Sequence, residues 1–432
     1  MWLVAAAVAG AGLPGGAAAQ AGFPVTFLDP SPRSRAMGGT GVAVPGADAF
    51  GPHLNPAHLS DAKGLTWARS RTRLVPRLAD DVELRSDALT LGAADVGLSL
   101  GGRPFNSLGG TVLDYGAVPA LGENGMDTTG LRRSYEEVRD FGLAFRVFST
   151  ARGLAGLAGW KLPPIHRYAD LAIGWRWKRF HSTVPLVYPW PPPDSVQGTA
   201  RDFGLRLRVS PVHDLAGEVR DGRESDGGRL RAIGGVAVDL YAGVSWTNSH
   251  GDTVLATRFA PEPGVVPTAL RRTGYGLRVT TGLPAFLQAD EFGESPGLAR
   301  WLGPTFTFTV AGEVVSQRHR PAIMTFVGRP DPVYERSATG WGAELTALGV
   351  LALRAGHMDE SASMGVTGGT WGFGLNLHYA DAVAVRYDRA SYPLPYFAEP
   401  GEAAGGARMR AHPWSWRVDV NPYGVLKVLL GE

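Results

Sequence analysis

Large apolar residues alternate with small or charged residues in short stretches that recur from about Gly64 to the C-terminus. In residues 171–178 (LAIGWRWK), Leu, Ile and two Trp occupy every second position, with Ala, Gly, Arg and Lys between them. The same alternation is clear in residues 203–209, 371–379 and 414–421. A period of two is that of a β-strand, whose successive side chains point to opposite faces. Because no long stretch shows the helical period of 3.6, the chain is predicted to be all-β.

Two kinds of all-β protein are compatible with these alternating faces. In a soluble sandwich the apolar faces pack together, whereas in a membrane barrel they meet lipid and the polar faces line a lumen. Aromatic residues near strand ends favour the barrel, because their rings suit the level of the lipid headgroups. A composition with 59 Gly, 12 Trp, 12 Tyr, 17 Phe and only 19% charged residues favours it too. Roughly 360 residues would supply about twelve to sixteen bilayer-spanning strands. The sandwich remains the alternative.

Basic side chains dominate the polar faces of the predicted strands, and a barrel would place them in its lumen. There they are expected to pair with carboxylates, of which Glu344, Asp388 and Asp419 are candidates, or to attract an anionic group of a ligand. The predicted lumen-facing residues are Arg146, Arg176, Lys178, Arg206, Arg208, Arg278, Arg354, Arg386, Asp388 and Arg417.

The N-terminus carries the features of an export signal. Residues 1–20 are uncharged and end in GGAAAQ, and the first charged side chain is Asp29. Small residues at the end of an apolar stretch are typical of a signal-peptide cleavage site. Glycines and a proline interrupt the stretch too early for a membrane anchor. We therefore expect a signal peptide at residues 1–20, a plug at 21–63 and a barrel of the bacterial outer membrane at 64–432.

Between the signal and the first strand lies a Gly-rich stretch followed by an Asn-Pro-Ala triplet. Asparagine is a preferred N-cap and proline suits the first helical position, so a short helical turn is expected at the triplet. Glycines let backbone segments pack closely or adopt positive φ. A compact plug is therefore plausible, and the residues predicted to shape it are Gly38, Gly39, Gly41, Asn55, Pro56 and Ala57.

This order of residues resembles the FadL-like outer-membrane family, which includes long-chain fatty-acid transporters and the PorV and PorQ proteins of type IX secretion. The segment RAMGGTGVA at residues 35–43 precedes the Asn-Pro-Ala triplet at 55–57, and both belong to the plug in that family. The specific part of the resemblance covers only Ser31 to Leu59. It implies a transmembrane antiparallel β-barrel of about fourteen strands.

The resemblance leaves two functions open. One is passive transport of a hydrophobic or amphipathic, fatty-acid-like molecule. The other is a PorV-like role, in which rim loops such as the proline-rich segment 185–194 hold secreted proteins or secretion machinery. Outer-membrane lipids would be partners in both. The chain departs from the usual pattern by ending in VLLGE without a terminal aromatic, so residues 414–421 are the expected closing strand, followed by a short periplasmic tail.

Other chemistries find little support in the sequence. With no cysteine, thiolate metal sites and thiol catalysis are excluded. The 42 basic and 40 acidic residues are spread along the chain, so nucleic acid is not an expected partner. Residues 97–101 match the G-x-S-x-G pattern of hydrolases, but Gly102, Arg103 and Pro104 follow where that motif needs a helix. Histidines lack metal-ligand spacing. No enzyme activity, metal or cofactor is predicted.

Overall fold

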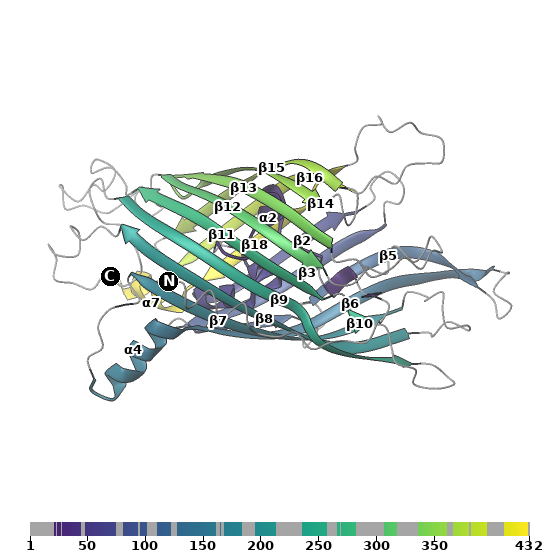
Figure 1. Ribbon diagram of the computed structural model, residues 1–432, viewed down its shortest axis with the longest axis horizontal. Coiled ribbons are helices and arrows are strands. Elements are labelled where there is room, and N and C mark those ends of the chain that lie inside the picture. Colours follow the sequence, from purple (N-terminus) through teal and green to yellow (C-terminus); the bar gives the residue numbers. More distant parts are fainter. Residues whose placement is uncertain are drawn as a thin grey trace.

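The computed structural model shows a long barrel with a short helical segment inside it (Figure 1). It describes residues 21–430 except for the positions 23, 27, 45–47, 75–80, 94–95, 102–109, 122–127, 161–164, 166–167, 184–194, 213–235, 257–265, 268, 282–305, 318–335, 361–365, 380–381 and 395–409. The predicted signal peptide and the rim loop 185–194 lie outside these residues.

Antiparallel strands form one sheet that closes on itself. The wall strands are β2 (Gly64–Arg73), β3 (Glu83–Ala93), β4 (Val96–Gly101), β5 (Gly110–Leu121), β6 (Thr128–Arg146), β7 (Ala169–Ser182), β8 (Ser195–Val212), β9 (Val236–Ala256), β11 (Leu270–Thr281), β12 (Phe306–Gln317), β13 (Arg336–Ala347), β14 (Leu351–Glu360), β15 (Val366–Tyr379), β16 (Val383–Pro393) and β18 (Trp414–Val420). The first and last of them, β2 and β18, pair with each other. Since β4 and β5 share one position between β3 and β6, the wall has fourteen positions. The predicted barrel is confirmed.

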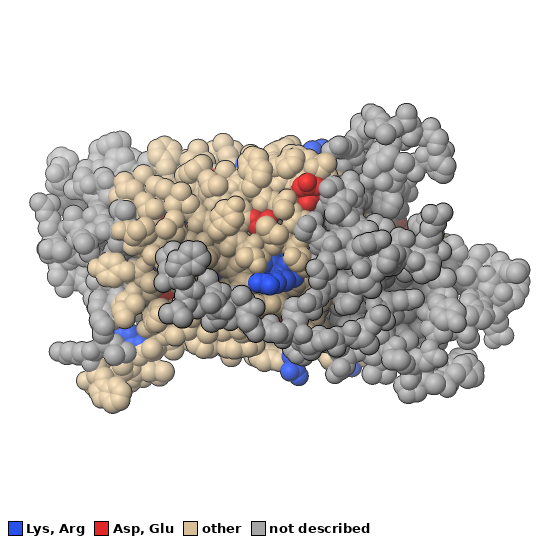
Figure 2. Space-filling model, in the orientation of Figure 1, with Lys and Arg blue, Asp and Glu red and all other residues tan. Residues whose placement is uncertain are grey.

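The wall turns its apolar face outward. On β7, Trp177 is 40% exposed, whereas its neighbours Arg176 and Lys178 are 2% and 3% exposed. Outward aromatic rings contact one another in a row across β6 to β9, formed by Phe145, Trp175, Phe203 and Trp246. Figure 2 shows an almost uncharged surface over the strands of the front face. A sandwich would bury these rings and expose the cations, so the soluble alternative is wrong.

Short helical elements between the N-terminus and β2 occupy the lumen, where they form a plug (Figure 1). They are η1 (Pro24–Thr26), α2 (Pro32–Ala36), α3 (Gly51–Leu54) and η2 (Pro56–Asp61). The serine before α2 caps it, because the Ser31 hydroxyl accepts a hydrogen bond from the amide of Ser34 at 3.0 Å. Apolar plug residues such as Met37 and Val42 are sealed from solvent and pack with Tyr241 and Ala311 of the wall.

Glycines on the inner face of the wall let the plug backbone lie directly against the strands. A Cβ on Gly342 would lie 2.6 Å from the carbonyl carbon of Met37, and one on Gly243 would lie 2.8 Å from the Cα of Ala43. In the plug, Gly38 has φ of +72° and no space for a side chain against the β13 and β14 backbone. The small residues of the alternating pattern are therefore contact points for the plug.

Helices α4 (Val147–Leu157) and α7 (Pro422–Leu430) lie at the same end of the barrel (Figure 1). There, β6 continues into α4, and β18 is followed by α7. The predicted closing strand is therefore correct to within one residue, and the expected tail is helical. Sequence periodicity did not predict α4. None of the helices within the described ranges is long and apolar enough to cross a membrane. The remaining short strands are β1 (Ala21–Gly22), β10 (Val266–Pro267) and β17 (Arg410–Ala411).

Candidate functional site

The wall position between β3 and β6 is built from two strands laid end to end. Near the end that carries α4 and α7, β4 pairs with both neighbours, as in Leu89 opposite Leu100. Farther along, β5 takes over, with Asp87 opposite Gly110. The ladder therefore changes partner between Asp87 and Leu89 on β3. The connecting residues 102–109 lie outside the described ranges.

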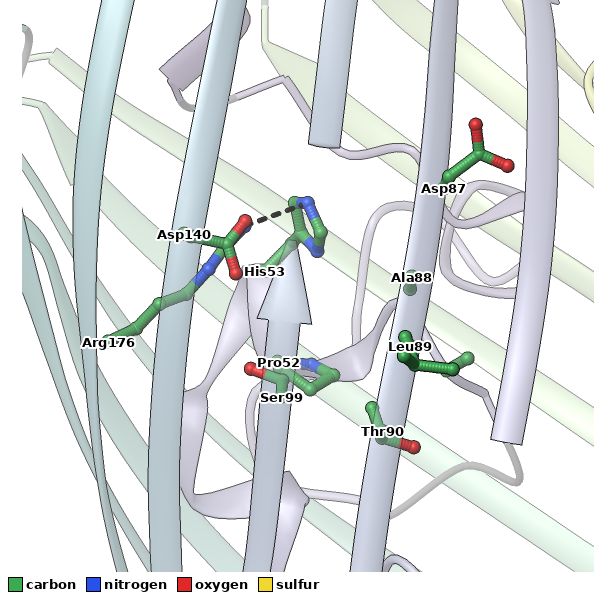
Figure 3. Close-up of a pocket in the computed structure, with 10 residues that line it drawn as sticks. Pro52, His53, Asp87, Ala88, Leu89, Thr90, Ser99, Asp140 and Arg176 are labelled. Carbon is green, nitrogen blue, oxygen red and sulfur yellow. Dashed lines mark hydrogen bonds and ion pairs between the residues drawn. The ribbon is translucent and has the colours of Figure 1, made fainter. Parts of the chain in front are cut away.

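A small hollow, with free space for about one water molecule, lies where the partner changes (Figure 3). Its lining includes Asp87 and Leu89, which face outward, and Ala88, which faces inward. Its inner side is formed by Pro52 and His53 of the plug helix α3. The hollow thus lies between the plug and the wall position at which β5 replaces β4. We call it the wall hollow.

A polar cluster closes the inner end of the wall hollow. Arg176 donates to Asp140 at 2.6 Å and lies 3.0 Å from Nε2 of His53, which is also 3.0 Å from the Thr111 hydroxyl. Burial, and then the nearby Arg176 charge, hold the pKa of His53 well below its usual value. A neutral ring can accept a hydrogen bond from the guanidinium, so the histidine, the arginine and the aspartate form one hydrogen-bonded group, although Nδ1 of His53 and Nε of Arg176 have no partner among the described residues.

A second polar cluster fixes the next part of the plug. The carboxylate of Asp61 at the end of η2 accepts hydrogen bonds from Arg206 and from Arg146, the latter at 2.5 Å. His58 lies 2.8 Å from the same Arg206. Burial alone would raise the pKa of Asp61, but Arg206, His58 and Arg146 together lower it well below its usual value. The aspartate therefore stays ionised and ties the plug to β6 and β8.

The opposite side of the plug carries the most extensive ion network. Arg33 of α2 binds Glu344 of β13 through two hydrogen bonds of 2.9 Å. Arg354 donates to the same glutamate at 2.6 Å and to Asp388 at 2.7 Å. Arg386 lies 3.4 Å from Asp388. All five side chains are at most 8% exposed. The chain of alternating charges joins α2 to β13, β14 and β16.

Asn55 holds the two halves of the plug together. Its side-chain oxygen accepts from the amide of Ala57 at 3.0 Å, so it caps η2 as expected. Its amide nitrogen donates to the carbonyl of Val42 at 2.8 Å and to the carbonyl of Leu205 on β8 at 3.1 Å. Nearby, Glu313 of β12 accepts from the backbone amides of Gly41 and Val42 at 2.9 and 3.0 Å. The plug loop is therefore tied to the wall through backbone groups.

The residues predicted from the sequence are placed as follows. The ten lumen candidates lie on the inward face. Two of the clusters described above unite Arg146 with Arg206, and Arg354 with Arg386 and Asp388. Lys178 binds Asp202, beside Arg176, at 2.7 Å. Arg417 pairs instead with Asp419, and the guanidinium carbon of Arg278 lies 5.6 Å from the centre of the Tyr241 ring. Arg208 projects inward elsewhere on β8.

Several functional candidates were missed by the sequence analysis. Arg33, His53 and Asp61 of the plug contact side chains of the wall, and Glu313 of the wall contacts the plug backbone. No local sequence pattern marks these residues. Ser99 of the G-x-S-x-G match lies within β4 and faces inward with no helix after it among the described residues, so it is not a nucleophile elbow. No group of three or more His, Cys, Asp or Glu among the described residues is placed to hold a metal ion.

Comparison with known proteins finds similarity in structure only. A FadL homologue of Pseudomonas aeruginosa is 9% identical, with 90% of this chain and 98% of that chain covered and a TM-score of 0.35. The toluene transporter TodX of Pseudomonas putida is 11% identical, with 92% of this chain and 98% of that chain covered and a TM-score of 0.39. The toluene transporter TbuX of Ralstonia pickettii is 10% identical, with the same coverage of both chains and a TM-score of 0.38. No family model matches. No curated protein matches in sequence. TM-scores below 0.5 establish no shared function.

Proposed function

We propose that this outer-membrane barrel is a passive channel for hydrophobic or amphipathic small molecules, which cross its wall at the wall hollow. The observation that carries the proposal is that outward-facing Leu89 and Pro52 of the plug line the same small hollow, at the wall position that β4 and β5 share. The domain boundaries proposed from the sequence, with a signal at 1–20 and a plug at 21–63, fit this role.

Physical chemistry favours a sideways route for such a molecule. The described lumen is filled with buried ion pairs, and an apolar molecule forced past them would separate charges from their partners at a high free-energy cost. The lipid-facing surface beside Leu89 is apolar, so transfer into the bilayer is favourable. A path from the lumen through the wall hollow lets the molecule leave before it meets the network around Glu344.

Passage also requires the plug to shift. Val42, Ala43 and Val44 are at most 2% exposed and fill the lumen against β9, β11 and β12. The chain has no native cysteine, so a single reversible lock can be placed here. A Cβ built on Gly276 lies 3.6 Å from the Cβ of Val44, within the usual range for a disulfide. The double variant Val44→Cys and Gly276→Cys should join the plug to β11.

The test is uptake of a fluorescent fatty acid and of toluene by cells that express the double variant. Oxidation should reduce uptake at least fivefold and reduction should restore it, because only the locked plug blocks the lumen. Each single-cysteine variant under the same oxidant is the matched control and should keep its uptake. Equal uptake by the oxidised and reduced double variant, with the disulfide verified by mass, would refute the proposal.

No described feature favours the secretion role over transport. The rim loop 185–194, on which that prediction depends, lies outside the described residues.

A further inference from the structure

Two arginines face each other on the outside of the barrel. Arg139 of β6 lies directly opposite Arg179 of β7, and both are exposed. Arg201, on the next strand, is opposite Trp177 and therefore diagonal to Arg179 on the same outer face. Like charges directly opposite on one face of a sheet are destabilising. Such a pair needs an anion nearby to offset the repulsion.

The protein itself supplies only part of that anion. Glu137 accepts from Nε of Arg139 at 2.9 Å, and the side-chain oxygen of Gln197 accepts from Arg179 at 3.2 Å. Among the described side chains of this patch, three arginines therefore face one carboxylate. Both hydrogen bonds hold the guanidinium groups in place and leave other N–H groups of each for a ligand. The patch is cationic and its geometry is fixed in advance.

A surface hollow lies between these side chains. It holds about 540 Å³ of empty space, part of it open to solvent, and is lined by Glu137, Arg139, Arg179, Phe180, His181 and Gln197. This hollow is separate from the wall hollow, because its polar residues belong to the outward face of β6, β7 and β8. It is large enough for a phosphate group with its neighbouring atoms.

An aromatic pair lies directly below the arginines, toward the apolar belt. Phe141 and Trp177 stack with their ring centres 5.7 Å apart and are 43% and 40% exposed. Phe141 follows Arg139 by two positions on β6 and Trp177 precedes Arg179 by two on β7, a spacing of about 7 Å. An anion-binding row therefore sits immediately above a lipid-facing row. That arrangement matches a molecule with a phosphate next to acyl chains.

We propose that this patch binds the phosphate of a phosphorylated glycolipid of the outer leaflet, the lipid A part of lipopolysaccharide. Along β6 and β7 the arginines lie farther than Phe141 and Trp177 from the end that carries α4 and the C-terminal helix α7, and a barrel inserted from the periplasm keeps its C-terminus on the periplasmic side (Figure 1). The arginines grip the phosphate through paired N–H groups. Phe141 and Trp177 pack against the acyl chains.

The test measures lipid retention by the purified full-length protein in detergent, using native mass spectrometry. The probe is bis-phosphorylated lipid A, with its dephosphorylated form and inorganic phosphate as comparisons. The variant is Arg139→Gln with Arg179→Gln. The matched control, Arg271→Gln with Arg389→Gln, removes two exposed outward arginines from β11 and β16. Retained heat-modifiable migration on gels shows that each variant is folded.

The wild type and the control should retain lipid A, and the test variant should bind it at least about tenfold more weakly, as loss of charged hydrogen bonds implies. Dephosphorylated lipid A should bind the wild type no better than it binds the variant. Equal retention of lipid A by the variant and the wild type would overturn the proposal. So would displacement of lipid A by inorganic phosphate at equal concentration, since the site would then recognise a free ion.

A thermal measurement separates binding from a merely structural role. Without lipid, the variant should melt at the same temperature as the wild type or higher, because the like-charge repulsion is gone. Lipid A should raise the melting temperature of the wild type and the control but not that of the variant. If lipid A stabilised all three proteins equally, the arginine pair would not be its binding site.

Discussion

The plug meets the barrel wall in two contrasting ways. On one flank, which we call the anchored flank, α2 is tied to β13, β14 and β16 by the network of Arg33, Glu344 and Arg354. On the other, the open flank, α3 borders the wall hollow through Pro52 and His53. The contrast shows where a plug can stay fixed while another part of it moves. A channel needs both, because a plug that detached entirely would leave a permanent pore.

Buried ion pairs suit an anchor for a particular reason. Their net contribution to stability is small, since desolvation offsets attraction, but removal of one partner leaves an uncompensated charge. On the anchored flank, a partly broken ion network is therefore strongly disfavoured relative to the intact one. Neutral contacts, such as those of Pro52 at the wall hollow, can be lost gradually. Four experiments on the plug test this distinction.

The largest effect is expected from Glu344→Leu on the anchored flank. It leaves Arg33 without its partner and Arg354 with only Asp388, so the free energy of plug opening should fall by about 3–5 kcal/mol. Hydrogen exchange of the α2 amides measures this opening. Arg69→Gln is the control, because it breaks an exposed outer pair worth about 0–1 kcal/mol. Unchanged α2 protection in the glutamate variant would remove the basis for an anchored flank.

A substitution between the flanks should have the next largest effect. In Gly174→Ala, the new Cβ overlaps the backbone of Pro56, and overpacking of this kind costs about 1–3 kcal/mol. Thermal unfolding and exchange of the η2 amides should both report the loss. Gly153→Ala in α4 is the matched control, since nothing lies within 4 Å of its Cβ. If both variants behaved alike, the glycine contacts would not position the plug.

Asn55→Ala should destabilise the plug somewhat less. It removes the cap of η2 and leaves the carbonyls of Val42 and Leu205 without that donor, at a cost of about 1–2 kcal/mol. Uptake of a fluorescent fatty acid should rise or fall with the changed plug position, whereas α2 exchange should stay as in the wild type. Loss of α2 protection in this variant would show that the two flanks move as one body.

The smallest effect concerns pH. Burial lowers the pKa of both His53 and His58, so the opened plug binds more protons than the closed plug below pH about 6.5. Closure should therefore weaken as pH falls through that window, by up to about 1.4 kcal/mol per pH unit for each histidine. The slope of η2 exchange against pH measures it. His53→Gln should halve the slope, and an unchanged slope would assign the effect elsewhere.

The architecture was largely predictable, because strand alternation is local. Residues 171–178 show it fully: the outward Trp and inward Arg and Lys are placed as expected. The lumen candidates follow from the same alternation, since face is set by parity alone. The Asn-Pro-Ala triplet also predicted its own cap, because Asn55 and Ala57 are two residues apart.

Partners across the lumen were not predictable. Arg33 and Glu344 are brought together by strand register and barrel closure, which depend on many distant pairings. The shared wall position of β4 and β5 depends on register in the same way. The G-x-S-x-G match drew attention to Ser99 as a nucleophile candidate, whereas Ser99 is an inward residue of β4. The sequence identifies inward glycines such as Gly174 only as small residues, and their contact with the plug backbone becomes evident only in the structure. Helix α4 is too short for its periodicity to stand out.

The seam between β2 and β18 places Leu65 opposite Val420, nearly a whole chain apart. Before the last strand pairs with β2, the sheet has two unpaired edges, and a bilayer offers their amides and carbonyls no water to hydrogen-bond. Insertion is therefore all or nothing. A chain cut short before Trp414 would lack the strand that closes the sheet, so it would not insert as a stable barrel.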